Sequence, residues 1–124
     1  MLNILFIGDI MGKPGRYAVN KLLPRLKEEL NIEFVIANGE NAAGGKGLTP
    51  SVVSELYNYG VDVITGGNHI WANREILNII DSEPALLRPA NFPPDMGIPG
   101  RGVGIFNRGD FSIAVVNLVG RVFM

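Results

Sequence analysis

The chain has 124 residues, 47% of them hydrophobic and 19% charged, which is typical of one packed globular domain and excludes a mainly disordered chain. Eleven basic and twelve acidic side chains leave a formal net charge of −1, which excludes the broad positive surface that nonspecific nucleic-acid binding or attachment to an anionic membrane requires. Because the chain has no cysteine, a disulfide framework and a thiolate metal site are excluded as well.

The first thirty residues predict a strand followed by a helix. Met1 to Gly8 is a continuous apolar run, which is expected of a strand buried on both faces. From Pro14 to Leu30 apolar residues recur at every fourth position, which predicts a helix, while Pro24 inside it favours a kink or two shorter helices. The apolar stripe of this helix comprises Ala18, Leu22, Leu26 and Leu30.

Two further apolar runs predict strands at Glu33 to Asn38 and at Val61 to Thr65. Between them, Thr49 is suited to cap a helix that has Pro50 at its first position. The order of strand, helix, strand, helix and strand predicts an α/β fold with a parallel sheet and right-handed crossovers.

The last third of the chain has a different texture. Five prolines fall between Pro84 and Pro99, which predicts an ordered loop without regular structure. Two apolar segments follow, Gly102 to Phe106 and Phe111 to Val119, and we expect them to form a β-hairpin around the four-residue turn Asn107 to Asp110. No repeat or linker divides the chain, so residues 1–124 are expected to form a single domain.

Each of the three early strands ends in glycine followed at once by polar side chains. The carboxyl ends of parallel strands share one edge of a sheet, and ligands bind outside that edge, so we expect these side chains to converge. The set is rich in oxygen, has one imidazole and lacks sulfur, which suits hard or borderline divalent cations such as Mn, Mg or Fe(II). Its members are Asp9, Glu40, Asn41, Asn68 and His69.

A metal site is favoured over a metal-free pair of acids, because two neighbouring carboxylates repel each other unless cations neutralise them. Two divalent ions could hold a hydroxide nucleophile and clamp a phosphoryl group, while His69 protonates the leaving oxygen. Plainer roles stay open for each residue. Asp9 can cap a helix or close a turn, and Glu40 and Asn41 can belong to a solvated loop. His69 can be a half-buried structural side chain, and the glycine-rich run Ala42 to Gly47 lacks the spacing of a Walker A loop.

Four segments also carry a likeness to a known family. They are GDIMGKPGR (Gly8 to Arg16), NGENAAGGKGLT (Asn38 to Thr49), GGNHIW (Gly66 to Trp71) and NLVGRVFM (Asn117 to Met124). In this order they resemble the amino-terminal half of the YmdB-like metallophosphoesterases, a bacterial branch of the calcineurin-like superfamily. The resemblance implies an α/β/β/α sandwich, of which this chain would be the amino-terminal half, and metal-dependent hydrolysis of phosphodiesters, with cyclic nucleotides as the substrate class.

Carried over by position, the resemblance makes Asp9 a ligand of one metal ion and Glu40 the carboxylate that bridges two. Asn41 and Asn68 become further ligands, and His69 becomes the catalytic imidazole and general acid. The two divalent ions would be Mn, Fe or Mg. The family's further metal-binding histidines belong to a carboxyl-terminal half outside these residues, so we expect this chain alone to be inactive.

The expected protein is therefore a cytoplasmic, homo-oligomeric phosphodiesterase that acts on a small molecule, with no stable nucleic-acid partner and no membrane association. Two alternatives stay open: a noncatalytic α/β binding or regulatory module, and a phosphomonoesterase on the same metal site. The sheet is also expected to expose an unpaired edge and an uncovered apolar face, which predicts self-association or marginal stability of the chain alone.

Overall fold

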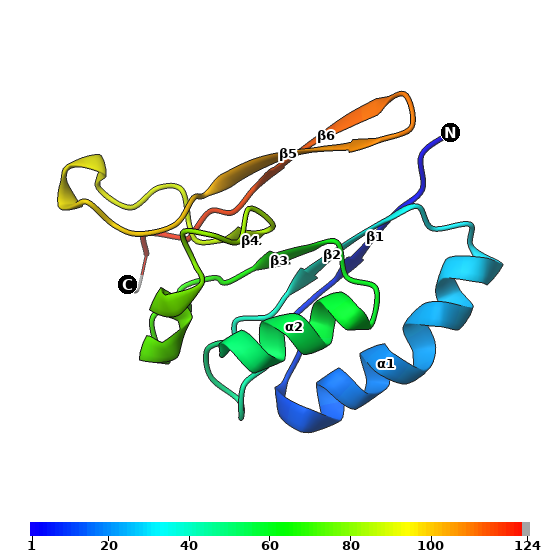
Figure 1. Ribbon diagram of the computed structural model, residues 1–124, viewed down its shortest axis with the longest axis horizontal. Coiled ribbons are helices and arrows are strands. Elements are labelled where there is room, and N and C mark those ends of the chain that lie inside the picture. Colours follow the sequence, from blue (N-terminus) through cyan, green and yellow to red (C-terminus); the bar gives the residue numbers. More distant parts are fainter. Residues whose placement is uncertain (123–124) are drawn as a thin grey trace.

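The computed structural model describes residues 1–122 and has three layers, with helices over one face of a sheet and a β-hairpin over the other (Figure 1). The sheet contains β1 (Ile4–Ile7), β2 (Phe34–Asn38), β3 (Val63–Thr65) and β4 (Leu86–Leu87), which lie in that order. Every neighbouring pair is parallel. The predicted α/β fold with a parallel sheet is confirmed. Phe123 and Met124, which end the fourth motif, lie outside the described residues.

Two helices pack on one face of the sheet, α1 (Gly12–Glu29) and α2 (Pro50–Asn58). Thr49 caps α2 as predicted, because its Oγ1 accepts a hydrogen bond from the N–H of Val52 at 3.2 Å. None of the helices within the described part of the chain is long and apolar enough to cross a membrane. The side chains that α2 buries are Val52, Val53 and Leu56.

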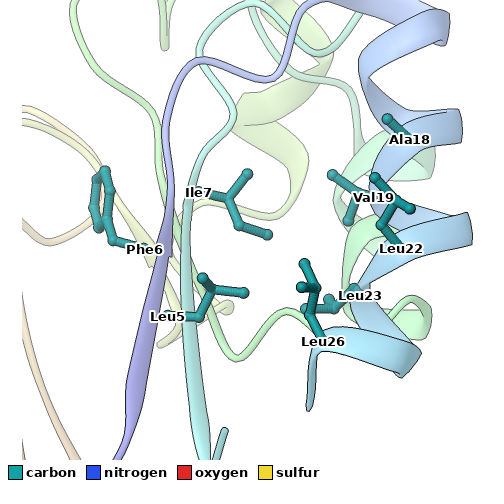
Figure 2. A pocket seen from close by; sticks show the side chains of 8 residues that line it. All are labelled: Leu5, Phe6, Ile7, Ala18, Val19, Leu22, Leu23 and Leu26. Carbon is teal, nitrogen blue, oxygen red and sulfur yellow. The ribbon is translucent and has the colours of Figure 1, made fainter. Parts of the chain in front are cut away.

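β1 is an edge strand, so the prediction that it is buried on both faces was wrong. It pairs only with β2, and Ile4 and Phe6 on one of its faces are 46% and 61% exposed. On the other face, Leu5 and Ile7 point toward α1 and line a hollow of about 250 Å³ between strand and helix (Figure 2). An apolar run becomes a buried strand only where a neighbour covers each face, and residues 1–122 leave most of the Phe6 side chain exposed.

α1 continues through Pro24, so the alternative of two shorter helices was wrong. The carbonyl that loses its partner at Pro24 belongs to Asn20, which is exposed, so water can satisfy it. The buried stripe also differs from the predicted one, because Val19 and Leu23 are buried while Leu22 is 52% exposed. Residues spaced by four drift about 40° around a helix at each step, so such a series cannot stay on one face.

The predicted hairpin is formed by β5 (Val103–Arg108) and β6 (Phe111–Val116), which are antiparallel. Its turn has two residues rather than the four predicted, because Arg108 pairs directly with Phe111. Gly109 in the turn has a φ of +54°, a value that glycine adopts readily.

The hairpin covers the face of the sheet opposite the helices, and polar side-chain contacts attach both of its ends to the sheet. Near its turn, Arg108 forms an ion pair with Asp62, whose other carboxylate oxygen accepts a hydrogen bond from the N–H of Val35 at 2.8 Å. Near its base, the amide nitrogen of Asn117 donates to the carbonyl of Leu87 at 2.9 Å. The side chains between hairpin and sheet include Phe34, Val63, Leu87, Phe106, Ile113 and Val115.

The proline-rich segment is more regular than predicted. Leu86 and Leu87 pair with β3 as β4 and are fully buried, and the short 3-10 helix η2 (Pro94–Met96) follows them. A second 3-10 helix, η1 (Arg74–Asn78), lies before the proline-rich segment. Elements this short do not produce a recognisable period in the spacing of apolar residues, so they cannot be predicted from that spacing. The prediction of a purely irregular loop was therefore wrong.

The uncovered β1 edge predicts self-association of this chain. Replacing Phe6 with lysine should raise the dissociation constant of the associated form by about tenfold or more, because a buried aromatic ring contributes roughly 1.5–3 kcal/mol and edge lysines oppose strand pairing. Sedimentation velocity over a range of concentrations measures the effect. Leu77→Lys is the control, since Leu77 is 49% exposed on η1. An equal effect of the two substitutions would contradict an interface at β1.

Candidate active site

The polar residues that follow three neighbouring strands meet at the carboxyl edge of the sheet. Parallel pairing keeps the carboxyl ends of β1, β2 and β3 side by side, as the sequence predicted. Hydrogen bonds and one contact within ion-pair distance join four of the five predicted residues, and the fifth is adjacent to one of them in the sequence. The four are Asp9, Glu40, Asn41 and His69, and the fifth is Asn68.

The loop that carries Glu40 and Asn41 is folded by its own backbone. The carbonyl of Asn41 accepts hydrogen bonds from the N–H groups of Gly12 at 2.9 Å and Gly45 at 3.1 Å. The carbonyl of Glu40 accepts from the N–H of Gly47 at 2.5 Å. Gly45 and Gly47 have φ values of +96° and +79°, which other residues rarely adopt. The glycine-rich run is therefore required to close the loop against the start of α1.

The side chain of Asn41 connects Asp9 to His69. Its Nδ2 donates to Asp9 Oδ1 at 2.7 Å, and its Oδ1 lies 2.7 Å from His69 Nδ1. An ionised carboxylate can only accept hydrogen bonds, so the amide nitrogen must face Asp9 and the amide oxygen must accept a hydrogen bond from Nδ1–H of His69. The imidazole therefore carries hydrogen on Nδ1, which leaves Nε2 to take up or release a proton.

Glu40 lies next to this hydrogen-bonded chain. Its Oε2 is 3.7 Å from His69 Nδ1, within ion-pair distance when the ring is protonated. The same oxygen is buried and has no hydrogen-bond partner among the described residues. A Cβ at Gly67 would overlap the carboxyl group of Glu40, so glycine at this position leaves the space that Glu40 fills. An unpartnered buried carboxylate oxygen is costly unless a cation or a proton meets it.

The donor set fits a metal ion in part. Asp9 and Glu40 offer carboxylate oxygens, and Asn41 offers an amide oxygen that retains a second lone pair. Asn68 is exposed, and no hydrogen bond within residues 1–122 joins its side chain to the other candidates. In the same part of the chain, no three histidine, aspartate or glutamate side chains come together as a metal site. The ligand roles therefore stay predictions.

A hollow of about 620 Å³ opens beside Asp9. It lies between the start of α1 and the glycine-rich loop, with Lys13 on one side and Gly44 and Gly45 on the other. Lys13 places a positive charge at this opening. The sequence does not indicate this role, and the only available signal is that Lys13 lies within the first motif. The hollow leaves Asp9 accessible to a small molecule.

Arg16 is a second residue near the site that the sequence did not indicate. Its Nη1 donates to the carbonyl of Ala42 at 2.6 Å, and its Nε donates to Glu55 Oε2 at 3.0 Å. Ala42 directly follows Glu40 and Asn41, so this contact lies immediately behind the site. Arg16 ends the first motif, but nothing in the spacing of that motif indicates either partner.

Comparisons with known proteins give the family and the fold of the chain. Residues 5–124 match the family described as "YmdB-like protein". The 2',3'-cyclic-nucleotide 2'-phosphodiesterase of Bacillus subtilis (strain 168) is 48% identical over 123 residues, which cover 99% of this chain and 46% of the relative. A crystal structure of a hypothetical protein from Thermus thermophilus superposes with a TM-score of 0.90 at 43% identity, over 98% of this chain and 46% of that one.

A second solved structure, described as a novel phosphatase from Mycoplasma pneumoniae, gives a TM-score of 0.89 at 33% identity. The match covers 98% of this chain and 45% of that protein. The chain thus spans less than half the length of the relatives that it matches.

Because a Cβ at position 67 would overlap Glu40, we predict that Gly67→Ala weakens metal binding. The φ of +52° at Gly67 makes alanine unfavourable by about 1–2 kcal/mol, and the new Cβ would also displace Glu40. Gly109→Ala is the matched control, because Gly109 has a φ of +54° and no atom within 4 Å of its added Cβ. Urea unfolding should show a similar backbone cost in both variants, whereas Mn²⁺ titration followed by electron paramagnetic resonance should show weaker binding only for Gly67→Ala. Equal Mn²⁺ binding by the two variants would contradict the placement of Glu40.

Proposed function

The chain belongs to the YmdB-like protein family, and from this premise we propose that it forms part of the active site of a metal-dependent phosphoesterase. The substrates are small phosphodiesters, with cyclic nucleotides as the class that the name of the Bacillus subtilis relative supports. The observation that carries the proposal is the buried Oε2 of Glu40, which has no hydrogen-bond partner among residues 1–122 and lies beside the hydrogen-bonded chain of Asp9, Asn41 and His69.

We assign the metal-binding roles to the side chains at the sheet edge. Asp9 would bind one of two divalent ions (Mn, Fe or Mg) and Glu40 would bridge both, while Asn41 and Asn68 would contribute amide oxygens. This oxygen-rich set suits such cations. When bound, the two ions would activate water and neutralise charge on the phosphoryl group.

His69 is proposed as the general acid. Because Asn41 holds the Nδ1–H group of the ring, the proton that leaves is carried by Nε2 of the imidazolium. Transfer of that proton to the departing alkoxide oxygen leaves a neutral ring that keeps hydrogen on Nδ1. Glu40, at 3.7 Å, attracts the positive charge of the ring before transfer. Asn41 thus orients the ring, and Asp9 in turn orients Asn41.

We assign the activity to a family-length protein, meaning one that contains residues 1–124 and extends to the length of the relatives. Two five- or six-coordinate ions need on the order of ten ligand positions. His69 is the single histidine of this chain and is assigned to proton transfer. We therefore propose that residues 1–124 form one domain with further polypeptide that completes the site, and that this chain alone has no measurable turnover.

A phosphomonoesterase on the same site is the second candidate, supported by the description of the Mycoplasma pneumoniae structure as a phosphatase. The two candidates use the same ligands and differ in the substrate pocket. Rates on an aryl phosphodiester and on the matching aryl phosphomonoester, measured with the same Mn²⁺-loaded protein, discriminate between them. A preference for the diester of at least about tenfold in kcat/KM, or about 1.4 kcal/mol, is expected.

Glu40→Gln tests the metal-bridging role. The substitution preserves size but removes the charge, so a family-length protein should lose Mn²⁺ binding and phosphodiesterase activity while its circular dichroism spectrum stays unchanged. Glu29→Gln is the control, because Glu29 is 53% exposed and pairs with Arg25 on the surface of α1. Full activity of Glu40→Gln would contradict the bridging role. A folded family-length protein without turnover in Mn²⁺ would favour the noncatalytic alternative.

His69→Ala tests the general acid. The variant should retain most of its Mn²⁺ but lose roughly 10²–10⁴-fold in rate on phosphodiesters with poor leaving groups. The loss should be smaller for activated aryl phosphodiesters, whose leaving groups need no proton. Rates on the two substrate types, measured in the same family-length protein, give the comparison. Equal losses would argue against proton donation by His69.

A further inference from the structure

A polar cluster lies directly behind the active-site loop and joins both helices. Arg16 on α1 contacts Glu55 on α2 through its Nε, which is 3.0 Å from Oε2. The hydroxyl of Tyr59, just past the end of α2, donates to the other oxygen of Glu55 at 2.5 Å. The Arg16 side chain is only 16% exposed. Neither the predicted metal ligands nor the general acid belongs to this cluster.

The remaining contact of Arg16 reaches the loop. Its Nη1 donates to the carbonyl of Ala42 at 2.6 Å, and Ala42 is fully buried. The N–H of the same residue donates to the carbonyl of Gly39 at 2.9 Å. The segment that contains Glu40 and Asn41 is thus restrained on both sides. It follows β2 directly on its amino-terminal side, and the hydrogen bonds of Ala42 hold its carboxyl-terminal side.

We propose that Arg16 is a positioning residue for the active site, because its guanidinium ties the Ala42 carbonyl to Glu55 and so fixes the directions of the Glu40 and Asn41 side chains. The catalytic consequence rests on the proposed function. The structural part, that Arg16 restrains the loop, stands on the hydrogen bonds alone.

The guanidinium group is suited to this role in a way that an ammonium group is not. It presents several N–H donors in a fixed plane, so one side chain can bind a carbonyl and a carboxylate in set directions at once. The hydrogen bond from Tyr59, and after it that from Arg16, lowers the pKa of Glu55 against the effect of its burial. The carboxylate is therefore charged at neutral pH and keeps Arg16 oriented toward the loop.

Arg16→Lys is the test, and Arg25→Lys is the matched control. Arg25 lies on the same helix and also uses its Nε to bind a glutamate, Glu29, at 3.1 Å, but it is 70% exposed, and no hydrogen bond within residues 1–122 joins it to the glycine-rich loop. The first readout is tryptic cleavage after Lys46, which is exposed within the glycine-rich loop. Cleavage depends on local opening of the loop, so Arg16→Lys should accelerate it about tenfold in this chain and Arg25→Lys should not.

The second readout is kinetic and uses the Mn²⁺-loaded family-length protein. Misplacement of catalytic groups by about 1 Å can cost on the order of 100-fold in rate, so Arg16→Lys should lower kcat by about 10- to 100-fold. KM and the thermal midpoint should remain close to those of Arg25→Lys. A residue with a merely structural role would lower the midpoint and leave kcat of the folded enzyme unchanged.

Glu55→Gln serves if Arg16→Lys does not fold. It preserves the contact of Arg16 with Ala42 but removes the charge that orients Arg16, so smaller changes in the same directions are expected. Unchanged cleavage after Lys46 in a folded variant overturns the proposal, as does faster cleavage with unchanged kcat. If the unsubstituted family-length protein has no phosphoesterase turnover, the proposed function fails, and the cleavage rates still decide whether Arg16 restrains the loop.

Discussion

The parallel pairing of β1, β2 and β3 is the constraint on which the candidate site depends. Three strands that run in one direction place the residues that follow them at a single edge, so Asp9 and His69 both contact Asn41 although about half of the chain separates them. Asn41 then converts this proximity into a defined arrangement. Its amide can face Asp9 only with nitrogen, and this one requirement sets the hydrogen on His69 as well. The pairing of the strands therefore determines, through Asn41, which ring nitrogen of His69 carries the hydrogen that faces this amide.

Features that follow from local chemistry were predictable from the sequence, and features set by neighbouring segments were not. Thr49 before a proline identifies a helix start from local residues alone, and the structure confirms it. The apolar run of β1, in contrast, has the same sequence pattern whether neighbouring segments cover its faces or leave them exposed. Leu22 and Leu23 are adjacent and identical, and only the direction in which α1 docks on the sheet decides which of them is buried.

The location of the site was predictable for the same reason, whereas its internal contacts were not. Glycine followed by a polar residue at three strand ends placed Asp9, Glu40, Asn41 and His69 at one edge. The contact between Arg16 and Ala42 joins positions 26 residues apart, and no local pattern encodes such a pair. Contacts of this kind follow from the three-dimensional packing of α1, α2 and the loop. The position of Lys13 beside the hollow depends on the same packing, so the sequence did not indicate it.

The contacts that hold the hairpin on the sheet indicate the order in which parts of the chain fold. Its own strands pair across a two-residue turn, so β5 and β6 can associate locally and early. The ion pair between Asp62 and Arg108 instead spans 46 residues, and such a contact repays its loop-closure entropy only after the sheet exists. We therefore expect docking of the hairpin to be a late step. Until then, Phe34, Val63 and Leu87 face water, and the nascent sheet is open on the side that the helices do not cover.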